Sequence, residues 1–213
     1  MPIRRLTLLT PLLLLLAFPV AASAQDASTI LAAVQKGIGK QLPPSLRITA
    51  SGSGYRPGKT AQDREHYRIA SYTADLNFTS GTGKSDSPWP VQAVIWTTPY
   101  GFIEGATSRS ATVAPETVQG TKYNVVTFTT TGGQQVKGYV TEQNTLERVR
   151  TEVQDPKLGK IDYEVVYLDW TPFNGIKFPS TIIQKENGQV SRILIVQTVE
   201  AAGAPAATGR ATS

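Results

Sequence analysis

The spacing of hydrophobic residues changes once along this chain, shortly before residue 46. In the first segment, 26–40, apolar residues recur three or four positions apart: Ile30, Leu31, Val34 and Ile38. This spacing predicts a short amphipathic helix with one apolar face. Asp26 is suited to cap its N-terminus, and Gly39 with Pro43 and Pro44 ends it. We expect its apolar face to pack on the rest of the fold.

From Leu46 onward the apolar positions alternate, which is typical of β-strands. The candidate strands are Leu46–Ser53, Tyr67–Thr79, Val91–Thr97, Lys122–Thr130, Gln134–Thr141, Leu146–Val153, Ile161–Trp170, Ile176–Ile183 and Val190–Val199. Turn-forming residues separate the later strands, as in Gly132-Gly133, Asn174-Gly175 and Asn187-Gly188. No separator after Lys122 has room for a helical crossover. The sequence therefore predicts a mainly β protein built on an antiparallel meander.

The last strands carry apolar residues on both faces. In the strand 161–170 one face carries Ile161, Tyr163, Val165 and Tyr167, and the other carries Val166, Leu168 and Trp170. In the strand 190–199 one face carries Val190, Leu194 and Val196, and the other carries Ile193, Ile195 and Val199. A sheet with one wet face alternates apolar and polar residues instead. We therefore expect both faces to be covered. Either a curved sheet holds helices or an apolar ligand in its concavity, or two sheets form a thick core.

A long connection separates the strand 91–97 from the strand 122–130. It begins with the turn Pro99-Tyr100-Gly101, after which Phe102, Ile103 and Ala106 form one side of a short helix. A loop rich in Ser, Thr and Ala follows. Connections of this length in a compact domain are usually functional or partly helical. We expect a helical lid over the mouth of the sheet, with an ordinary packed loop as the alternative.

Residues 1–24 are predicted to be a secretory signal peptide. Arg4 and Arg5 precede an apolar run, and Ala22-Ser23-Ala24 forms a small-residue cleavage site. The apolar run is shorter than the roughly 20 residues that span a membrane, which disfavours an uncleaved anchor. We expect a periplasmic chain without an integral membrane span, comprising a single β domain over 25–200 and a disordered tail over 201–213.

Composition narrows the possible partners. Residues 1–24 hold two basic and no acidic residues, so their removal lowers the formal net charge from +5 to +3. The basic residues are scattered and form no stripe of the kind that binds nucleic acid. The chain has no Cys, so a hydrophobic core rather than a disulfide must hold the fold.

The sequence offers little that supports catalysis. His66 is the only His, which excludes a zinc site built from several histidines. A Ser-His-Asp arrangement would have to use His66, which lies in a charged segment that we expect at the surface. Gly83-Lys84-Ser85 lacks the first glycine of a phosphate loop, and we expect an ordinary loop there. Paired carboxylates such as Asp162 and Glu164 fit charges on an exposed strand face. We therefore predict no catalytic residue, no metal ligand and no cofactor.

Several dispersed patterns together resemble a known family. They are the exported start, the N-terminal helix, the meander, the run Thr98-Pro99-Tyr100-Gly101-Phe102 and the run from Phe173 to Ser180. Over roughly Tyr67–Val199 the chain looks like the LolA/LolB-like domain of bacterial periplasmic proteins. More narrowly, it resembles the version that precedes a metallo-β-lactamase-fold domain in some larger exported proteins.

The resemblance implies a fold and a type of ligand. It implies an incomplete antiparallel β-barrel, a curved meander sheet whose mouth is closed by an N-terminal helix and a short helical lid. It also implies an apolar cavity, which holds acyl chains in the lipoprotein carriers. The His-x-His-x-Asp-His run of the attached hydrolase is absent here. Metal-dependent hydrolysis is therefore not expected.

Two hypotheses of function follow. The first is a non-enzymatic periplasmic binding protein for a lipid-like or other amphipathic molecule. The second is an accessory module that binds an exported protein, such as a metallohydrolase, through a sheet edge or the loop after Pro99. For the first hypothesis, aromatic residues near the lid and on the strands are the candidate ligand contacts: Trp96, Tyr100, Phe102, Tyr139, Tyr167 and Phe178.

Overall fold

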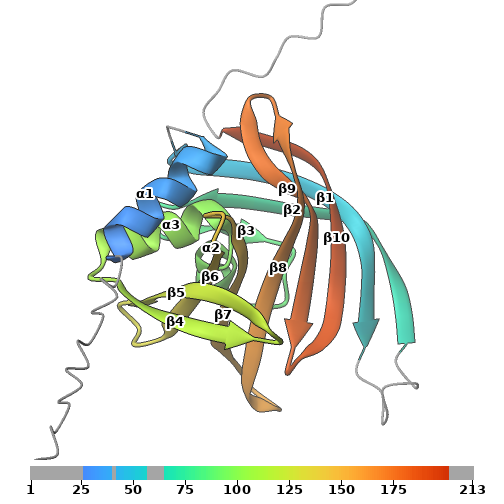
Figure 1. The fold of residues 1–213 in the computed structure, drawn as a ribbon. Helices are drawn as coiled ribbons and strands as arrows, with labels where there is room; N and C mark the ends of the chain where they lie inside the picture. The colour runs from blue at the N-terminus through green and yellow to red at the C-terminus, as the bar shows by residue number, and fades with distance from the viewer. Residues whose placement is uncertain (1–25, 40–41, 57–64, 202–213) are drawn as a thin grey trace, which may run out of the picture.

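The computed structural model describes residues 26–39, 42–56 and 65–201, which form one curved antiparallel sheet and three helices (Figure 1). The predicted signal peptide, 1–24, lies outside the described residues. So does the predicted tail except for Ala201, which is the last residue of the final strand.

The helices are α1 (Ala27–Ile38), α2 (Val91–Trp96) and α3 (Pro99–Ser108). The strands are β1 (Ser45–Arg56), β2 (Glu65–Asn77), β3 (Thr82–Ser85), β4 (Thr112–Val118), β5 (Thr121–Thr129), β6 (Gln135–Thr141), β7 (Leu146–Asp155), β8 (Gly159–Phe173), β9 (Ile176–Glu186) and β10 (Gln189–Ala201). All ten lie in one sheet in the order β3-β2-β1-β10-β9-β8-β7-β6-β5-β4. The predicted meander is confirmed, and it extends from β4 to β10.

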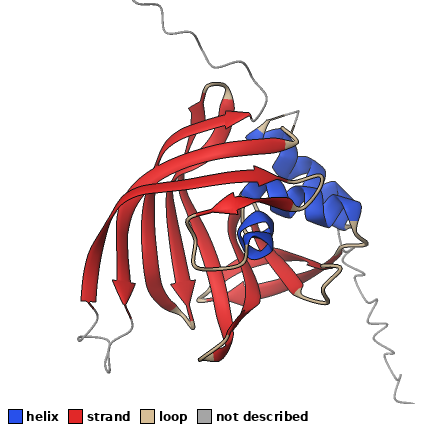
Figure 2. Cartoon of the chain, turned by 180° about the vertical axis from the view of Figure 1, so that it is seen from behind, coloured by secondary structure: helices blue, strands red, loops and turns tan. Residues whose placement is uncertain are grey.

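The sheet remains open, with β3 at one edge and β4 at the other. These two edge strands follow one another in the chain, and α2 and α3 form the connection between them. Figure 2 shows the helices on the concave side of the sheet, where they close the mouth of the half-barrel. The predicted lid is thus a consequence of the topology as well as of the local sequence.

Helix α1 begins and ends close to the predicted positions. The Asp26 carboxylate accepts a hydrogen bond from the backbone N–H of Thr29 at 2.7 Å, and this bond lowers the pKa of Asp26. The predicted apolar residues are buried, and α1 packs against α3 and β9. The apolar spacing therefore identified both the helix and the face that it buries.

The segment Val91–Thr97 is a helix, so its prediction as a strand was wrong. Its residues 93–96 are all buried, because α2 lies inside the concavity and packs on β2, β3 and α3. Contacts around the whole helix override the strand preference of Val94 and Ile95. Two short strands were also missed: β3, at the predicted loop 83–85, and β4, in the predicted Ser-, Thr- and Ala-rich loop.

The two faces of the sheet differ. The concave face is buried by the helices, as Tyr163, Val165 and Tyr167 of β8 show. On the convex face Val166 is buried, but Leu168 is 39% and Ile195 48% exposed. The expectation that both faces of the last strands are covered is therefore wrong at these positions. A single curved sheet replaces the alternative of a thick two-sheet core.

Helix α3 docks on the sheet where the sheet lacks a side chain. A Cβ atom at Gly138 of β6 would lie 2.1 Å from Cζ of Phe102, whose ring occupies that space. Gly105 of α3 makes a similar opening for Phe128 of β5, since its Cβ would lie 2.6 Å from the Phe128 ring. The rings of Phe102 and Phe128 contact each other, with centroids 5.6 Å apart. These contacts fix the distance between the lid and the sheet.

We predict that Gly138→Ala destabilises the fold by displacing Phe102. Overpacking of this kind costs about 1–3 kcal/mol, and denaturant unfolding monitored by circular dichroism would measure it. Gly132→Ala is the matched control, because a Cβ there meets nothing closer than 3.8 Å. Equal stability of the two variants would contradict the close packing of Phe102 on β6.

Candidate functional site

A small cavity of about 30 Å³ lies between the lid and the concave face of the sheet. Its walls are mostly apolar and come from both halves of the fold: Ile48, Tyr72, Ala74, Leu76, Val94, Thr97, Thr98, Pro99, Tyr163, Val165, Tyr167, Phe178, Ile182, Gln184 and Leu194. A volume of this size holds about one water molecule. The cavity is therefore nearly filled by its own side chains.

The junction between α2 and α3 forms the roof of the cavity. Thr97 donates its hydroxyl to the carbonyl oxygen of Ala93 at 2.7 Å, and Thr98 donates its hydroxyl to that of Ile95 at 2.8 Å. The Thr98 oxygen also caps α3 by accepting from the N–H of Gly101. From the sheet, the Tyr167 hydroxyl donates to the carbonyl oxygen of Thr97. The roof is thus hydrogen-bonded to β8.

Tyr100 is a second connection between the lid and the sheet. Its ring is stacked between Phe78 and Phe178, with centroid distances of 6.4 and 6.1 Å. Its hydroxyl donates to the carbonyl oxygen of Lys177 in β9 at 3.0 Å and lies 3.5 Å from that of Ile38 in α1. Tyr100 therefore joins α1, α3 and the sheet at one point.

Burial changes the acidity of the tyrosines around the cavity. Loss of solvation raises the pKa of Tyr100 to about 12. The same cause raises the pKa of Tyr163 and of Tyr167 well above the usual value. These phenols stay neutral at physiological pH and serve as hydrogen-bond donors or as apolar wall.

The structure separates the predicted contact residues into three groups. Tyr167 and Phe178 line the cavity. Tyr100 stacks on Phe178, while Trp96 and Phe102 attach the lid to the sheet through Phe128. The last three residues are buried parts of the lid, and their roles as ligand contacts stay a prediction.

Tyr139 lies apart from the other predicted residues. It packs with Tyr123 and Val125 in a separate cluster of buried residues. In β6 it neighbours Gly138, which faces Phe102 and the lid, so Tyr139 points to the convex face. The guanidinium of Arg148 lies 5.8 Å from the centre of its ring. The structure therefore does not bring Tyr139 together with the cavity.

Sequence reasoning did not select most of the cavity wall. Tyr72, Ala74 and Leu76 line it from β2, and their alternation within the predicted strand 67–79 was a usable signal. Tyr163 and Val165 share the predicted face of Tyr167 and line the cavity as well. Gln184 was not identified because a single polar residue in a strand carries no signal of burial.

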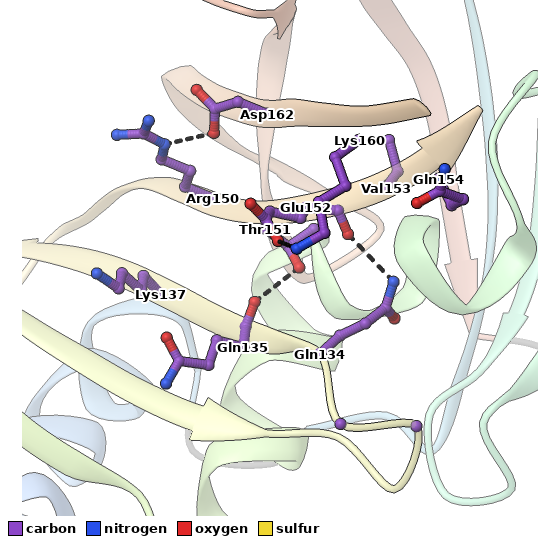
Figure 3. A pocket seen from close by; sticks show the side chains of 12 residues that line it. Gln134, Gln135, Lys137, Arg150, Thr151, Glu152, Val153, Gln154, Lys160 and Asp162 are labelled. Carbon is purple, nitrogen blue, oxygen red and sulfur yellow. Dashed lines mark hydrogen bonds and ion pairs between the residues drawn. The ribbon is translucent and has the colours of Figure 1, made fainter. Parts of the chain in front are cut away.

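A larger hollow of about 710 Å³ lies elsewhere, where the ends of β6 and β7 diverge (Figure 3). It is open and polar, and its charged groups are largely paired. Lys160 contacts Glu152 at 3.1 Å, and Arg150 contacts Asp162. The Gln134 amide donates to the backbone oxygen of Glu152 at 3.1 Å. Since these groups satisfy one another, the apolar cavity under the lid is the stronger candidate site.

Within the described ranges, no group of three or more His, Asp or Glu side chains is placed to hold a metal ion. His66 is exposed on β2, where its ring contacts Tyr55. None of the described helices combines the length and the hydrophobicity that crossing a membrane requires.

We predict that stability falls between pH 10 and about 12, in part because of Tyr100. Its phenol ionises near pH 10 when unfolded but near pH 12 when folded, so unfolding releases a proton in this window. The contribution of the neutral Tyr100 phenol to stability is complete below pH 10 and is lost as the pH rises through the pKa of the folded state. Urea unfolding at increasing pH should show a shallower decline for Tyr100→Phe than for the wild type.

The same variant loses the hydrogen bond to Lys177, which costs about 1 kcal/mol at neutral pH. Phe78→Leu is the control, because it removes one stacking partner of Tyr100 without removing a titrating group. An unchanged pH dependence in Tyr100→Phe, with the normal decline in Phe78→Leu, would contradict the raised pKa of Tyr100.

Comparison with known proteins gives distant structural similarity. No protein-family model matches the sequence, and no curated protein matches it. One solved structure to which the chain is similar is the LolA superfamily protein NE2245 from Nitrosomonas europaea. It has a TM-score of 0.48 and 12% identity, and the match covers 85% of this chain and 96% of that chain.

Two further structures are similar over comparable lengths. A putative outer membrane lipoprotein-sorting protein domain from Vibrio parahaemolyticus has a TM-score of 0.41 and 10% identity, with 82% of this chain and 92% of that chain covered. A DUF1329 family protein from Desulfovibrio piger has a TM-score of 0.43 and 8% identity, with the same coverage of 82% and 92%.

Proposed function

We propose that this chain is a periplasmic binding protein that holds a lipid-like or other amphipathic molecule between the sheet and the lid. The observation that carries the proposal is the small, mostly apolar cavity between α2, the start of α3 and the concave face. Burial of an apolar chain there is favourable by about 25 cal/mol for each Å² removed from water.

The cavity must expand to accept such a molecule. Ligand pockets usually have volumes of roughly 300–1,000 Å³. The cavity here is far smaller, with a volume of about 30 Å³. The lid is the element that can move, since α2 and α3 cover the concave face without belonging to the sheet. Its hydrogen bonds from Tyr167 to Thr97 and from Tyr100 to Lys177 would break during opening.

The proposal includes export and a non-catalytic role. Export is inferred from the predicted signal peptide in residues 1–24. The non-catalytic role is inferred from the wall of the cavity, where Gln184 and the hydroxyl groups of threonine and tyrosine are the polar side chains. These groups can orient a bound molecule. At physiological pH the tyrosine phenols are neutral, so the side chains of the wall supply no charged acid or base.

The alternative function, an accessory module for an exported protein such as a metallohydrolase, has one specific observation in its favour. Strand β2 pairs with β3 only over Ala74–Asn77. Within the described residues, its outer edge from Glu65 to Tyr72 therefore has no strand partner. An extended segment of another protein can add to such an edge. Crosslinking in the periplasm would then recover a protein partner rather than a lipid.

We predict that the protein binds a dansyl-labelled fatty acid and that Ala74→Leu abolishes this binding. Ala74 lines the cavity and is 1% exposed, so a larger side chain there occupies the space that the ligand needs. Dansyl fluorescence on titration with protein measures the affinity. Native mass spectrometry of protein purified from the periplasm would show whether a lipid is retained.

Ala32→Leu is the matched control, because Ala32 is exposed on α1 and the same atoms are added outside the cavity. Thermal unfolding would confirm that both variants fold, and Ala74→Val provides a smaller change if Ala74→Leu does not fold. Undiminished binding in folded Ala74→Leu, or no binding by the wild type, would contradict the proposed function.

A further inference from the structure

Arg192 of β10 places a positive charge on the concave face, beside the cavity. It pairs with Gln184 of β9 and with Gly54 of β1, and paired residues of antiparallel strands point to the same face. Gln184 lines the cavity, and so does Leu194, two residues beyond Arg192 in the same strand. Strands β9 and β10 lie side by side in the curved sheet (Figure 1).

The guanidinium of Arg192 has no counter-ion in the described part of the chain, where it also makes no hydrogen bond. Arg148 and Arg150, by contrast, each contact an acidic side chain. Arg192 is half-buried, and its charge reaches the buried tyrosines of the cavity. Burial raises the pKa of Tyr72 and of Tyr163, whereas the charge of Arg192 acts to lower both.

Two buried polar atoms, one in the cavity wall and one beside it, also lack a hydrogen-bond partner. Gln184 is 5% exposed, and its side-chain oxygen is buried without a hydrogen bond. The indole nitrogen of Trp89 is likewise buried and unpaired, and the Trp89 ring lies 5.9 Å from that of Tyr163, which lines the same cavity. Folded proteins leave few buried polar atoms unpaired, so such atoms at a cavity indicate a missing partner.

Arg192 and Trp89 share one chemical preference, and Gln184 can meet it. A guanidinium and an indole N–H only donate hydrogen bonds. The unpaired atom of Gln184 is an acceptor, and turning its amide about the last bond presents the NH₂ as a donor instead. An anionic, acceptor-rich group satisfies all of them, and guanidinium binds phosphate and carboxylate in the strongest, charge-assisted way. A neutral or cationic group would leave the charge of Arg192 uncompensated.

We propose that the ligand is an anionic amphiphile whose phosphate or carboxylate binds Arg192, Gln184 and the Trp89 indole while its apolar chain enters the cavity under the lid. This inference rests on the proposed function and names the class of ligand. Glu186 opposes this positive charge, since it pairs with Tyr163 in the neighbouring strand and raises the pKa of that phenol, as Asp86 does for Tyr72. It limits the affinity for an anion.

Matched single-chain amphiphiles test the inference directly. Dodecyl phosphate and dodecyl maltoside carry the same chain on an anionic and a neutral head, and inorganic phosphate carries the anion without a chain. Calorimetric titrations below the micelle concentration, at one ionic strength, give three affinities. We expect the wild type to prefer dodecyl phosphate over the maltoside and to bind inorganic phosphate weakly.

The readout for each variant is the ratio between the affinities for the anionic and the neutral amphiphile. Arg192→Gln should lower this ratio roughly ten- to hundredfold, the range for a hydrogen bond to a charged group. Glu186→Gln should raise it. Arg68→Gln is the matched control, because it removes the same charge from an exposed position on β2 and should leave the ratio unchanged.

The outcomes separate the inference from the function on which it rests. Binding of both amphiphiles with an equal ratio in wild type and Arg192→Gln would overturn the inference and leave the proposed function intact. Binding of neither amphiphile would overturn both. If inorganic phosphate binds as tightly as dodecyl phosphate and this binding depends on Arg192, the site binds small anions rather than amphiphiles. This result would overturn the inference. Arg192→Lys should retain part of the preference for the anionic amphiphile.

Discussion

The connection from β3 to β4 is the constraint on which the rest of this structure depends. These strands are consecutive in the chain yet form opposite edges of one sheet, so the residues between them must cross the concavity. A segment that crosses an apolar concave face has to bury its own apolar residues, and helices satisfy their backbone hydrogen bonds internally while doing so. The lid, the cavity and the attachment points on β5, β8 and β9 all follow from this crossing.

The periodic parts of the fold were predictable because their faces differ in environment. Helix α1 shows its apolar spacing, and the strands after residue 121 alternate between turns of recognisable chemistry. The prediction was wrong for helix α2, because Ala93 to Trp96 are all buried and show no periodicity that would distinguish a helix from a strand. Strand β4 failed for the opposite reason: it is an edge strand whose residues are mostly exposed, with Pro115 in its middle.

The candidate site was predictable only in part. Alternation tells which residues share a face of a strand, but curvature decides which face becomes concave, and curvature is a property of the whole sheet. Tyr139 and Tyr167 illustrate this. Both are aromatic residues in predicted strands, but Tyr167 lines the cavity and Tyr139 points to the convex side. Gly138 shows a second limit of sequence-based prediction. Its missing side chain leaves room for the ring of Phe102, and this contact is visible only in the packed structure.

The positions of the tryptophans have a practical consequence. The chain contains three, and each lies against a part of the lid or its supporting strands: Trp89 against Tyr163, Trp96 between Phe128 and Arg109, and Trp170 against Tyr167. Indole emission depends on the polarity around the ring and on nearby cations. The protein therefore carries intrinsic optical reporters, and movement of the helices away from the sheet would change its ultraviolet fluorescence without any added label.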